Sequence, residues 1–234
     1  MKRILGLLGG IVVATGLVSC DQGRSAAKDG LAAQGGFGDS TLIIDPRVIY
    51  GDDNRTDLFQ ISDPSLLALA DSTVALMEGS KLQLQSSGRY TLAKANLGTD
   101  MNLCSSERFR DQPDSAFCSG SLVGPDLVLT AGHCIPDATA CSTTKFVFGF
   151  AVKAQGVNPS TIEASEVYSC VEVLHTQAIA AGADFAVVRL NKTVPNHKPL
   201  AVNSGAGLNN GDDIFVIGNP VGLPTKIAGG AQVR

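Results

Sequence analysis

The sequence has 234 residues, of which 44% are hydrophobic, and it carries a formal net charge of −4. This length and composition suffice for the core of one large β domain or two small ones. The 18 lysines and arginines are scattered along the chain and form no basic cluster, so nucleic acid is excluded as an expected partner.

The first twenty residues have the pattern of an export signal. A Lys-Arg pair precedes an apolar run over residues 4–18, which is too short to span a bilayer and ends in small residues. Leu-Val-Ser-Cys at residues 17–20 resembles a bacterial lipobox, which implies a lipid anchor on Cys20. A plain secretory signal is the alternative. Both predict export to the periplasm or the cell exterior, where disulfides persist.

Residues 21–45 are rich in Gly, Ala, Ser and Gln, and they cannot bury enough apolar surface to fold alone. We expect a flexible tether there, followed by a folded domain over residues 46–234. Near the start of that domain, Ser-Asp-Pro at residues 62–64 offers an N-cap and a proline for a first turn. It therefore predicts a short helix that continues through Leu69.

Strand patterns dominate the remainder of the chain. Residues 81–85 alternate polar and apolar side chains, as a half-buried strand does, whereas residues 127–129 form the continuous apolar run of a buried strand. Further strands are predicted over residues 73–77, 89–93, 146–150, 166–174, 185–190 and 214–217. Many short strands separated by turns rich in Gly and Pro predict an all-β barrel.

The most informative segment ends in Thr-Ala-Gly-His-Cys at residues 130–134. A histidine that transfers protons near neutral pH must be held in one tautomer and one orientation. The small residues before His133 would leave room for a substrate and a nucleophile. The segment resembles the trypsin-like serine peptidases, whose catalytic histidine has this context. The resemblance implies that His133 is the general base and that Cys118 and Cys134 form a disulfide. A histidine without a catalytic role is the alternative.

The resemblance extends to residues 184–190, Asp-Phe-Ala-Val-Val-Arg-Leu, which are similar to the family's Asp-Ile-Ala-Leu-Leu-x-Leu strand. It implies that Asp184, 51 residues after His133, is the acid that orients the imidazole. The other two histidines match no catalytic pattern. We expect His175 at a strand end and His197 in a polar turn, both as solvated surface residues.

The family's serine nucleophile, in a Gly-Asn/Asp-Ser-Gly context, does not occur after Asp184. Ser204 stands in Asn-Ser-Gly-Ala-Gly but lies too close to Asp184 along the chain to match. Residues 217–227 resemble the first part of the second barrel in V8-like (glutamyl endopeptidase) relatives. We therefore expect a C-terminally truncated peptidase whose nucleophile would follow Arg234, so that the chain as given would be close to inactive.

The resemblance implies two antiparallel six-stranded β-barrels, the second incomplete in this chain. It also implies hydrolysis of peptide bonds in a polypeptide substrate by a Ser-His-Asp mechanism, by a monomer without a cofactor. Arg47, followed by Val-Ile-Tyr-Gly, resembles a zymogen activation site; a strand edge is the alternative. A lipid-anchored binding protein that has abandoned catalysis is the alternative to an enzyme.

Five cysteines remain once Cys20 is set aside. With the implied pair assigned, Cys104, Cys141 and Cys170 leave one thiol over, which predicts either an absent partner or a free thiol. A zinc site is the competing use of clustered cysteines. There is no Cys-x-x-Cys pair and no second histidine at ligand spacing, so we expect no metal.

Overall fold

The computed structural model describes residues 53–178, 182–205 and 207–234. The predictions for the export signal, Cys20, the tether and Arg47 concern residues outside these ranges. Within the described part, no helix combines the length and the apolar character that crossing a membrane requires.

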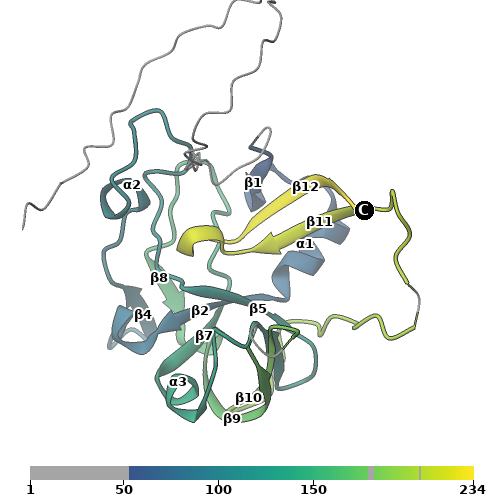
Figure 1. Cartoon of the computed structure of the whole chain (residues 1–234). Coiled ribbons are helices and arrows are strands. Elements are labelled where there is room, and N and C mark those ends of the chain that lie inside the picture. Colours follow the sequence, from purple (N-terminus) through teal and green to yellow (C-terminus); the bar gives the residue numbers. More distant parts are fainter. Residues whose placement is uncertain (1–52, 179–181, 206) are drawn as a thin grey trace, which may run out of the picture. The chain divides into compact units, whose positions relative to one another are not determined.

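A closed antiparallel barrel of six strands is the main feature of the described residues (Figure 1). Around the barrel the strand order is β10-β6-β5-β2-β7-β9. The strands are β2 (Thr73–Glu78), β5 (Cys118–Leu122), β6 (Leu127–Thr130), β7 (Thr144–Phe148), β9 (Val167–Gln177) and β10 (Phe185–Leu190). Every strand is paired on both sides, so the barrel has no free edge. The predicted all-β barrel is confirmed.

Strands β2 and β7 bury both of their faces. Val74 and Leu76 point into the main core with Phe146, whereas Met77 and Val147 belong to a second apolar cluster. The second cluster lies against a small sheet of β3 (Leu82–Leu84), β4 (Arg89–Leu92) and β8 (Thr161–Glu163). Burial on two sides explains why residues 73–77 read as a continuous run without polar alternation.

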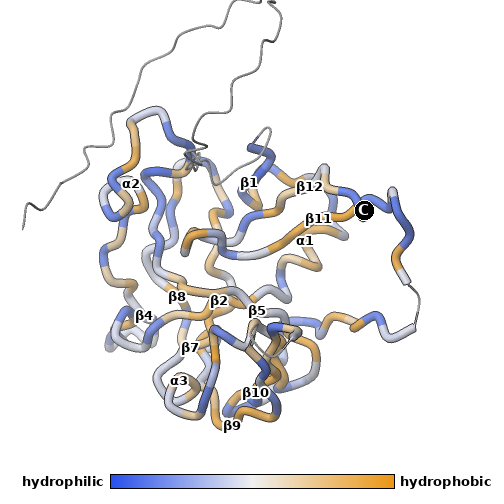
Figure 2. Tube along the Cα trace, viewed as in Figure 1, coloured by the Kyte–Doolittle hydropathy of each residue, from blue (hydrophilic) through white to orange (hydrophobic). Residues whose placement is uncertain are grey.

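A third sheet lies outside the barrel, in the order β1-β12-β11. Its strands are β1 (Arg55–Asp57), β11 (Asp213–Gly218) and β12 (Lys226–Gln232). It is not closed, and β11 forms one edge, so the second barrel stays a prediction. That edge strand carries hydrophobic residues along much of its length (Figure 2), and its Ile214, Phe215 and Val216 are exposed to solvent.

The helices are short. The helix predicted at residues 62–64 is confirmed as α1 (Pro64–Asp71), where the Asp63 carboxylate caps the N-terminus by accepting the Ser65 amide at 2.8 Å. The others are α2 (Leu97–Asp100), α3 (Ala138–Thr143) and the single turns η1 (Leu58–Gln60), η2 (Gly79–Lys81), η3 (Ala164–Glu166) and η5 (Pro220–Gly222).

Candidate active site

The strand order of the barrel brings His133 and Asp184 together. Strand β6 ends three residues before His133, and β10 begins directly after Asp184. These strands are antiparallel neighbours, with Ala186 opposite Thr130. The end of β6 therefore lies beside the start of β10, and the two loops that carry the candidate base and acid leave the barrel at the same point.

Asp184 contacts His133 at two positions. Its Oδ2 lies 2.5 Å from His133 Nδ1, and its Oδ1 accepts the backbone amide of His133 at 2.9 Å. The hydrogen bond from the ring, followed by that from the amide, lowers the pKa of the Asp184 carboxyl, although burial opposes the shift. The ionised carboxylate can only accept, so we assign the ring proton to Nδ1. Nε2 is then the nitrogen available to take a proton.

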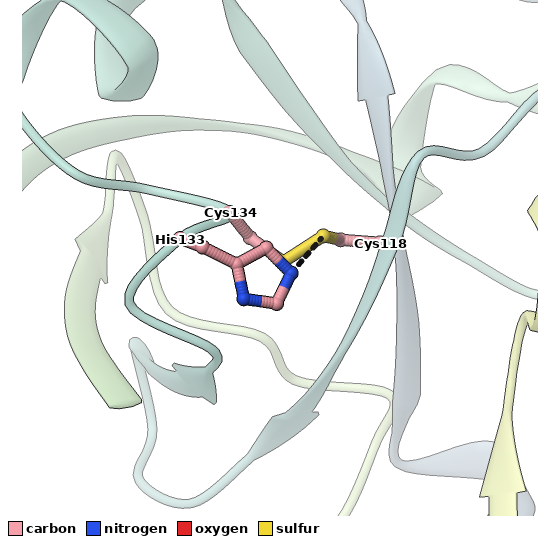
Figure 3. A group of neighbouring side chains, drawn as sticks. All are labelled: Cys118, His133 and Cys134. Atoms are coloured by element: carbon pink, nitrogen blue, oxygen red, sulfur yellow. Dashed lines mark hydrogen bonds between the residues drawn. A yellow bond between two sulfur atoms is a disulfide. The ribbon is translucent and has the colours of Figure 1, made fainter. Parts of the chain in front are cut away.

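The second ring nitrogen faces a disulfide (Figure 3). Cys118, the first residue of β5, is bonded to Cys134, and His133 Nε2 lies 3.4 Å from Cys134 Sγ and 4.0 Å from Cys118 Sγ. The bond closes a loop of 16 residues, which stabilises the fold by roughly 3 kcal/mol in the chain-entropy model. It ties the backbone of the histidine directly to the neighbouring strand.

These three side chains also form a group with the spacing of metal ligands. Cysteine binds metal as the thiolate, however, and both sulfurs are engaged in the disulfide. The group therefore does not make a zinc site.

Residues 118–233 match the family described as trypsin-like peptidase domain. This part of the chain is a trypsin-like peptidase domain. The match begins at Cys118 and includes both His133 and Asp184. Among solved structures, the chain is similar to a Glu endopeptidase determined in complex with MPD, at 16% sequence identity and a TM-score of 0.46, over 80% of this chain and 72% of that chain. A comparison with curated protein sequences found no match.

Gly132 is small for a reason that the sequence did not indicate. A Cβ at this position would come within 2.1 Å of the Gln177 carbonyl oxygen at the end of β9. Nearby, the Thr176 hydroxyl donates to the Ile135 carbonyl at 3.0 Å. The backbone at the end of β9 therefore fills the space beside Gly132. The close packing there and the hydrogen bond from Thr176 hold the histidine loop against β9. The expectation that it leaves room for a substrate is wrong for Gly132.

The structure does not bring a hydroxyl nucleophile to His133. Among the described residues, the polar atoms within hydrogen-bonding distance of Nε2 are the two disulfide sulfurs. Ser204 is exposed in the segment between β10 and β11 and makes no hydrogen bond with His133 in the described structure. The peptidase domain thus presents the candidate base and the candidate acid, without a hydroxyl partner for Nε2 among the described residues.

The other two histidines differ from each other. His175 is exposed near the end of β9, as predicted, and stacks on Phe185 at 4.9 Å between ring centroids. The prediction of a solvated His197 is wrong: its side chain is 6% exposed. Its Nδ1 lies 2.9 Å from Asp71 Oδ2 and its Nε2 lies 2.6 Å from Glu166 Oε2.

The two contacts of His197 connect three parts of the peptidase domain. A neutral imidazole has a single N–H, so both contacts are hydrogen bonds only when the ring or one carboxyl carries an additional proton. Asp71 ends α1 and Glu166 ends η3, while the ring stacks on Phe148 of the barrel core. His197 therefore holds the segment after β10 onto the barrel and has a structural role.

A second disulfide joins Cys141 of α3 to Cys170 of β9. The sequence left this pairing open among three cysteines. No cysteine in the described part of the chain is free, so the alternative of a free thiol is wrong there. One disulfide therefore anchors the chain directly after His133, at Cys134, and the other anchors α3 at Cys141.

Proposed function

We propose that the protein is a serine-type endopeptidase in which His133 is the general base and Asp184 orients it. The observation that carries this proposal is the double contact of Asp184 with the ring and the backbone amide of His133, within a trypsin-like peptidase domain. In the reaction, His133 Nε2 takes the proton of a serine hydroxyl as its oxygen attacks the peptide carbonyl. The same nitrogen then protonates the departing amine, and Asp184 stabilises the imidazolium formed between the two steps.

The proposal requires a serine that the 234 residues do not present in a Gly-x-Ser-Gly context after Asp184. That this serine follows Arg234 in the reading frame stays a prediction, and the DNA sequence beyond the Arg234 codon checks it. An in-frame Gly-x-Ser-Gly would supply the nucleophile. A stop codon directly after Arg234 would contradict the enzyme proposal for this product.

We also propose export and anchoring of the protein through a lipid on Cys20. Two disulfides within the described residues support an oxidising compartment, because such bonds are rare in the reducing cytosol. Cys20→Ala should move the protein from the membrane fraction to the soluble fraction. Mass spectrometry of the mature N-terminus should then distinguish a lipidated Cys20 from a plain secretory signal.

The alternative candidate is a lipid-anchored binding protein that no longer catalyses. It is favoured by one observation, the lack of a hydroxyl within hydrogen-bonding distance of Nε2 among the described residues. Such a protein would bind polypeptides without cleaving them. It would also fail to react with a fluorophosphonate, which labels only an activated serine.

The deciding experiment uses the product of the complete reading frame and measures the hydrolysis of fluorescent casein. His133→Ala should lower the turnover number by about 10⁶-fold, because the base and the nucleophile act as a unit. Asp184→Asn should lower it by about 10⁴-fold, because the amide favours the wrong imidazole tautomer. His175→Ala, which changes an exposed histidine on β9, is the matched control and should retain activity. Undiminished hydrolysis by His133→Ala would contradict the proposal.

A further inference from the structure

Cys118, His133 and Cys134 place two sulfur atoms and one ring nitrogen in a single group (Figure 3). These three atoms all lie within 4.8 Å of one another. Cys118 begins β5, and the other two residues follow the paired strand β6. While the disulfide is intact, the sulfurs are not thiolates and bind no metal. Reduction of the disulfide would give the same three atoms a different chemistry, which the proton relay does not use.

The ring nitrogen already lies at the distance from both sulfurs that a zinc ion requires. Tetrahedral zinc has Zn–S bonds of about 2.3 Å and Zn–N bonds of about 2.0 Å, which separate a nitrogen ligand from a sulfur ligand by about 3.5 Å. His133 Nε2 lies 3.4 Å from Cys134 Sγ and 4.0 Å from Cys118 Sγ. The histidine can therefore share one ion with both sulfurs after little movement of its ring.

The two sulfurs, in contrast, have to move apart. Two thiolates on one tetrahedral zinc ion are about 3.8 Å apart, whereas the sulfurs of a disulfide are about 2.0 Å apart. The Cα atoms of Cys118 and Cys134 are 6.2 Å apart, toward the wide end of the disulfide range of about 4.4–6.8 Å. Rotation about the Cα–Cβ bonds can then separate the sulfurs while the backbone of β5 and of the histidine loop stays in place.

Asp184 prepares the His133 ring as a metal ligand as well as a base. Its Oδ2 lies 2.5 Å from Nδ1, so the ring proton is assigned to Nδ1 and the lone pair of Nε2 faces the sulfurs. Histidines that bind zinc commonly donate their other ring N–H to a carboxylate in this way. The carboxylate fixes the tautomer and makes the free nitrogen a stronger ligand.

An ion can reach the group from the side of the histidine. The His133 side chain is 64% exposed, and His133 and Cys134 both line a cavity of about 330 Å³. The residues that line this cavity include the carboxylate of Glu78 and no lysine or arginine, which favours the entry of a cation. Water from the cavity can complete the coordination, since zinc with three protein ligands takes water in its fourth position.

We propose that reduction of the Cys118–Cys134 disulfide creates a zinc site, whose ligands are both cysteine thiolates, His133 Nε2 and one water molecule. In the redox step, a dithiol reductant transfers two electrons and two protons to the bond between the sulfurs. That bond breaks, each sulfur becomes a thiol, and the reductant becomes a disulfide. Zn²⁺ then displaces the two thiol protons into solvent and binds both thiolates.

The zinc site goes beyond the peptidase function, because no substrate or nucleophile takes part in it. It would nevertheless affect that function. Zinc would occupy the lone pair of Nε2 that the proposed base uses, so the reduced, zinc-bound form would be inactive. Transfer of two electrons from the thiolates to a disulfide oxidant would restore the bond and release the ion. This last consequence alone rests on the proposed peptidase function.

Cobalt is the probe, because its absorption spectrum reports the ligands that surround it. The 234-residue chain is reduced with a water-soluble phosphine, separated from the reagent and titrated with Co²⁺ in the absence of oxygen. We expect sulfur-to-cobalt charge-transfer bands together with the intense visible bands of a tetrahedral site, and Zn²⁺ should abolish both. The chain with intact disulfides should show neither. Equal spectra of the reduced and oxidised chains would overturn the proposal.

Two double variants separate this site from binding by other thiols. Cys118→Ser/Cys134→Ser should abolish the cobalt bands. Cys141→Ser/Cys170→Ser removes the same number of thiols from the second disulfide, and it is the matched control that should keep them. If reduction unfolded the chain and exposed thiols bound the metal, the two double variants would bind Co²⁺ alike. That result would overturn the proposal.

Two further variants test whether the histidine and its carboxylate belong to the site. Asp184→Asn should weaken Co²⁺ binding by about 10–100-fold, the usual effect of changing a carboxylate behind a histidine ligand. His133→Ala removes the ligand itself and should weaken binding at least as much, whereas the control His175→Ala should have no effect. Unchanged affinity of His133→Ala would mean that the thiols bind metal without the ring, and the assignment would fall.

The cobalt spectrum requires no turnover, so the two proposals can fail separately. Failure of casein hydrolysis by the complete product would contradict the peptidase function and leave the zinc site standing. Casein hydrolysis that depends on His133, together with a reduced chain that shows no cobalt bands, would contradict only the zinc site.

Discussion

The closed barrel and the sheet β1-β12-β11 differ in how their strands are paired. Every barrel strand is paired on both sides around a core in which aromatic side chains such as Phe146 and Phe148 are fully buried. The sheet has three strands, and its edge strand β11 exposes the apolar side chains of Ile214, Phe215 and Val216. Such an edge is a template for pairing with other chains and hence an aggregation hazard.

The difference indicates which region determines the geometry of the proposed proton relay. His133 and Asp184 both lie in loops next to strands of the barrel, and their mutual contacts involve no residue of the sheet. The connection between β11 and β12 contacts the barrel and the residues after β7. The Asn219 amide donates to Ser119 Oγ of β5, and the Thr225 amide donates to the Phe150 carbonyl, both at 2.8 Å. The base and its acid should therefore stay in place when the sheet is perturbed.

The same substitution in the two regions should give very different losses of stability. Phe146→Ala empties a fully buried site in the barrel and should reduce the free energy of unfolding by about 3–5 kcal/mol. Phe215→Ala removes a half-exposed ring from β11 and should change it by less than about 0.5 kcal/mol, while reducing aggregation. Urea unfolding of both variants measures the contrast. Comparable losses would show that the edge strand is packed in solution.

Unlike the exposed residues of β11, Lys226 at the start of β12 is buried. Its ammonium is buried and lies 2.6 Å from Asp57 Oδ1, and it also donates to Gln112 Oε1 and the Pro224 carbonyl at 2.8 Å. Burial lowers the pKa of Lys226, and the Asp57 carboxylate opposes that shift. The ammonium therefore connects β1, β12 and the segment before β5 in one polar network.

Lys226→Met should leave the Asp57 carboxylate buried without a counter-ion and cost about 3 kcal/mol. The double variant Lys226→Met/Asp57→Asn removes both charges and should recover most of that loss. Thermal unfolding of the single and double variants provides the measurement. If the double variant were no more stable than Lys226→Met, the ion pair would not be the source of the effect.

Most of the strands that the sequence predicted contain large apolar side chains. The runs at residues 73–77 and 185–190 became β2 and β10, and the resemblance correctly led to the strand that follows Asp184. Strand β5 was not predicted because Cys-Ser-Gly-Ser-Leu contains little apolar surface. Its Gly120 must be small, since a Cβ there would lie 2.7 Å from Val128 Cγ1. A hydrophobic pattern cannot indicate a strand whose packing requires the absence of a side chain.

In the candidate site and around it, too, some features could be predicted from local sequence and others could not. The contact of His133 with Asp184 was anticipated from two local motifs, and the aspartate motif gained its weight from the histidine motif. The burial of His197 could not be anticipated, because its partners Asp71 and Glu166 are 126 and 31 residues away along the chain. The polar turn around His197 looks solvated in sequence, but residues of α1, η3 and β7 contact its ring in the structure. Long-range pairing was likewise needed to connect Cys141 with Cys170.

A smaller effect than that of Lys226→Met is expected at Asp114, where the segment entering β5 meets the connection between β11 and β12. A Cβ at Gly222 of η5 would lie 2.8 Å from the Asp114 carbonyl, so the two regions are in close contact there. Burial raises the pKa of the Asp114 carboxyl, and the nearby Asp100 carboxylate adds to that rise. The folded state therefore binds this proton more tightly than the unfolded chain does, and the charged form destabilises the fold at neutral pH.

Asp114→Asn should consequently stabilise the protein at pH 7, by less than about 1 kcal/mol because the carboxyl is partly exposed to solvent. The gain should shrink as the pH falls through the raised pKa of Asp114 toward its ordinary value of 3.8, since the unaltered carboxyl becomes neutral in that range. Asp111→Asn, at a largely exposed side chain nearby, is the control and should show no such pH dependence. Thermal unfolding between pH 3 and pH 7 measures the difference. A constant gain across that range would mean that packing, rather than charge, decides stability where the barrel meets the sheet.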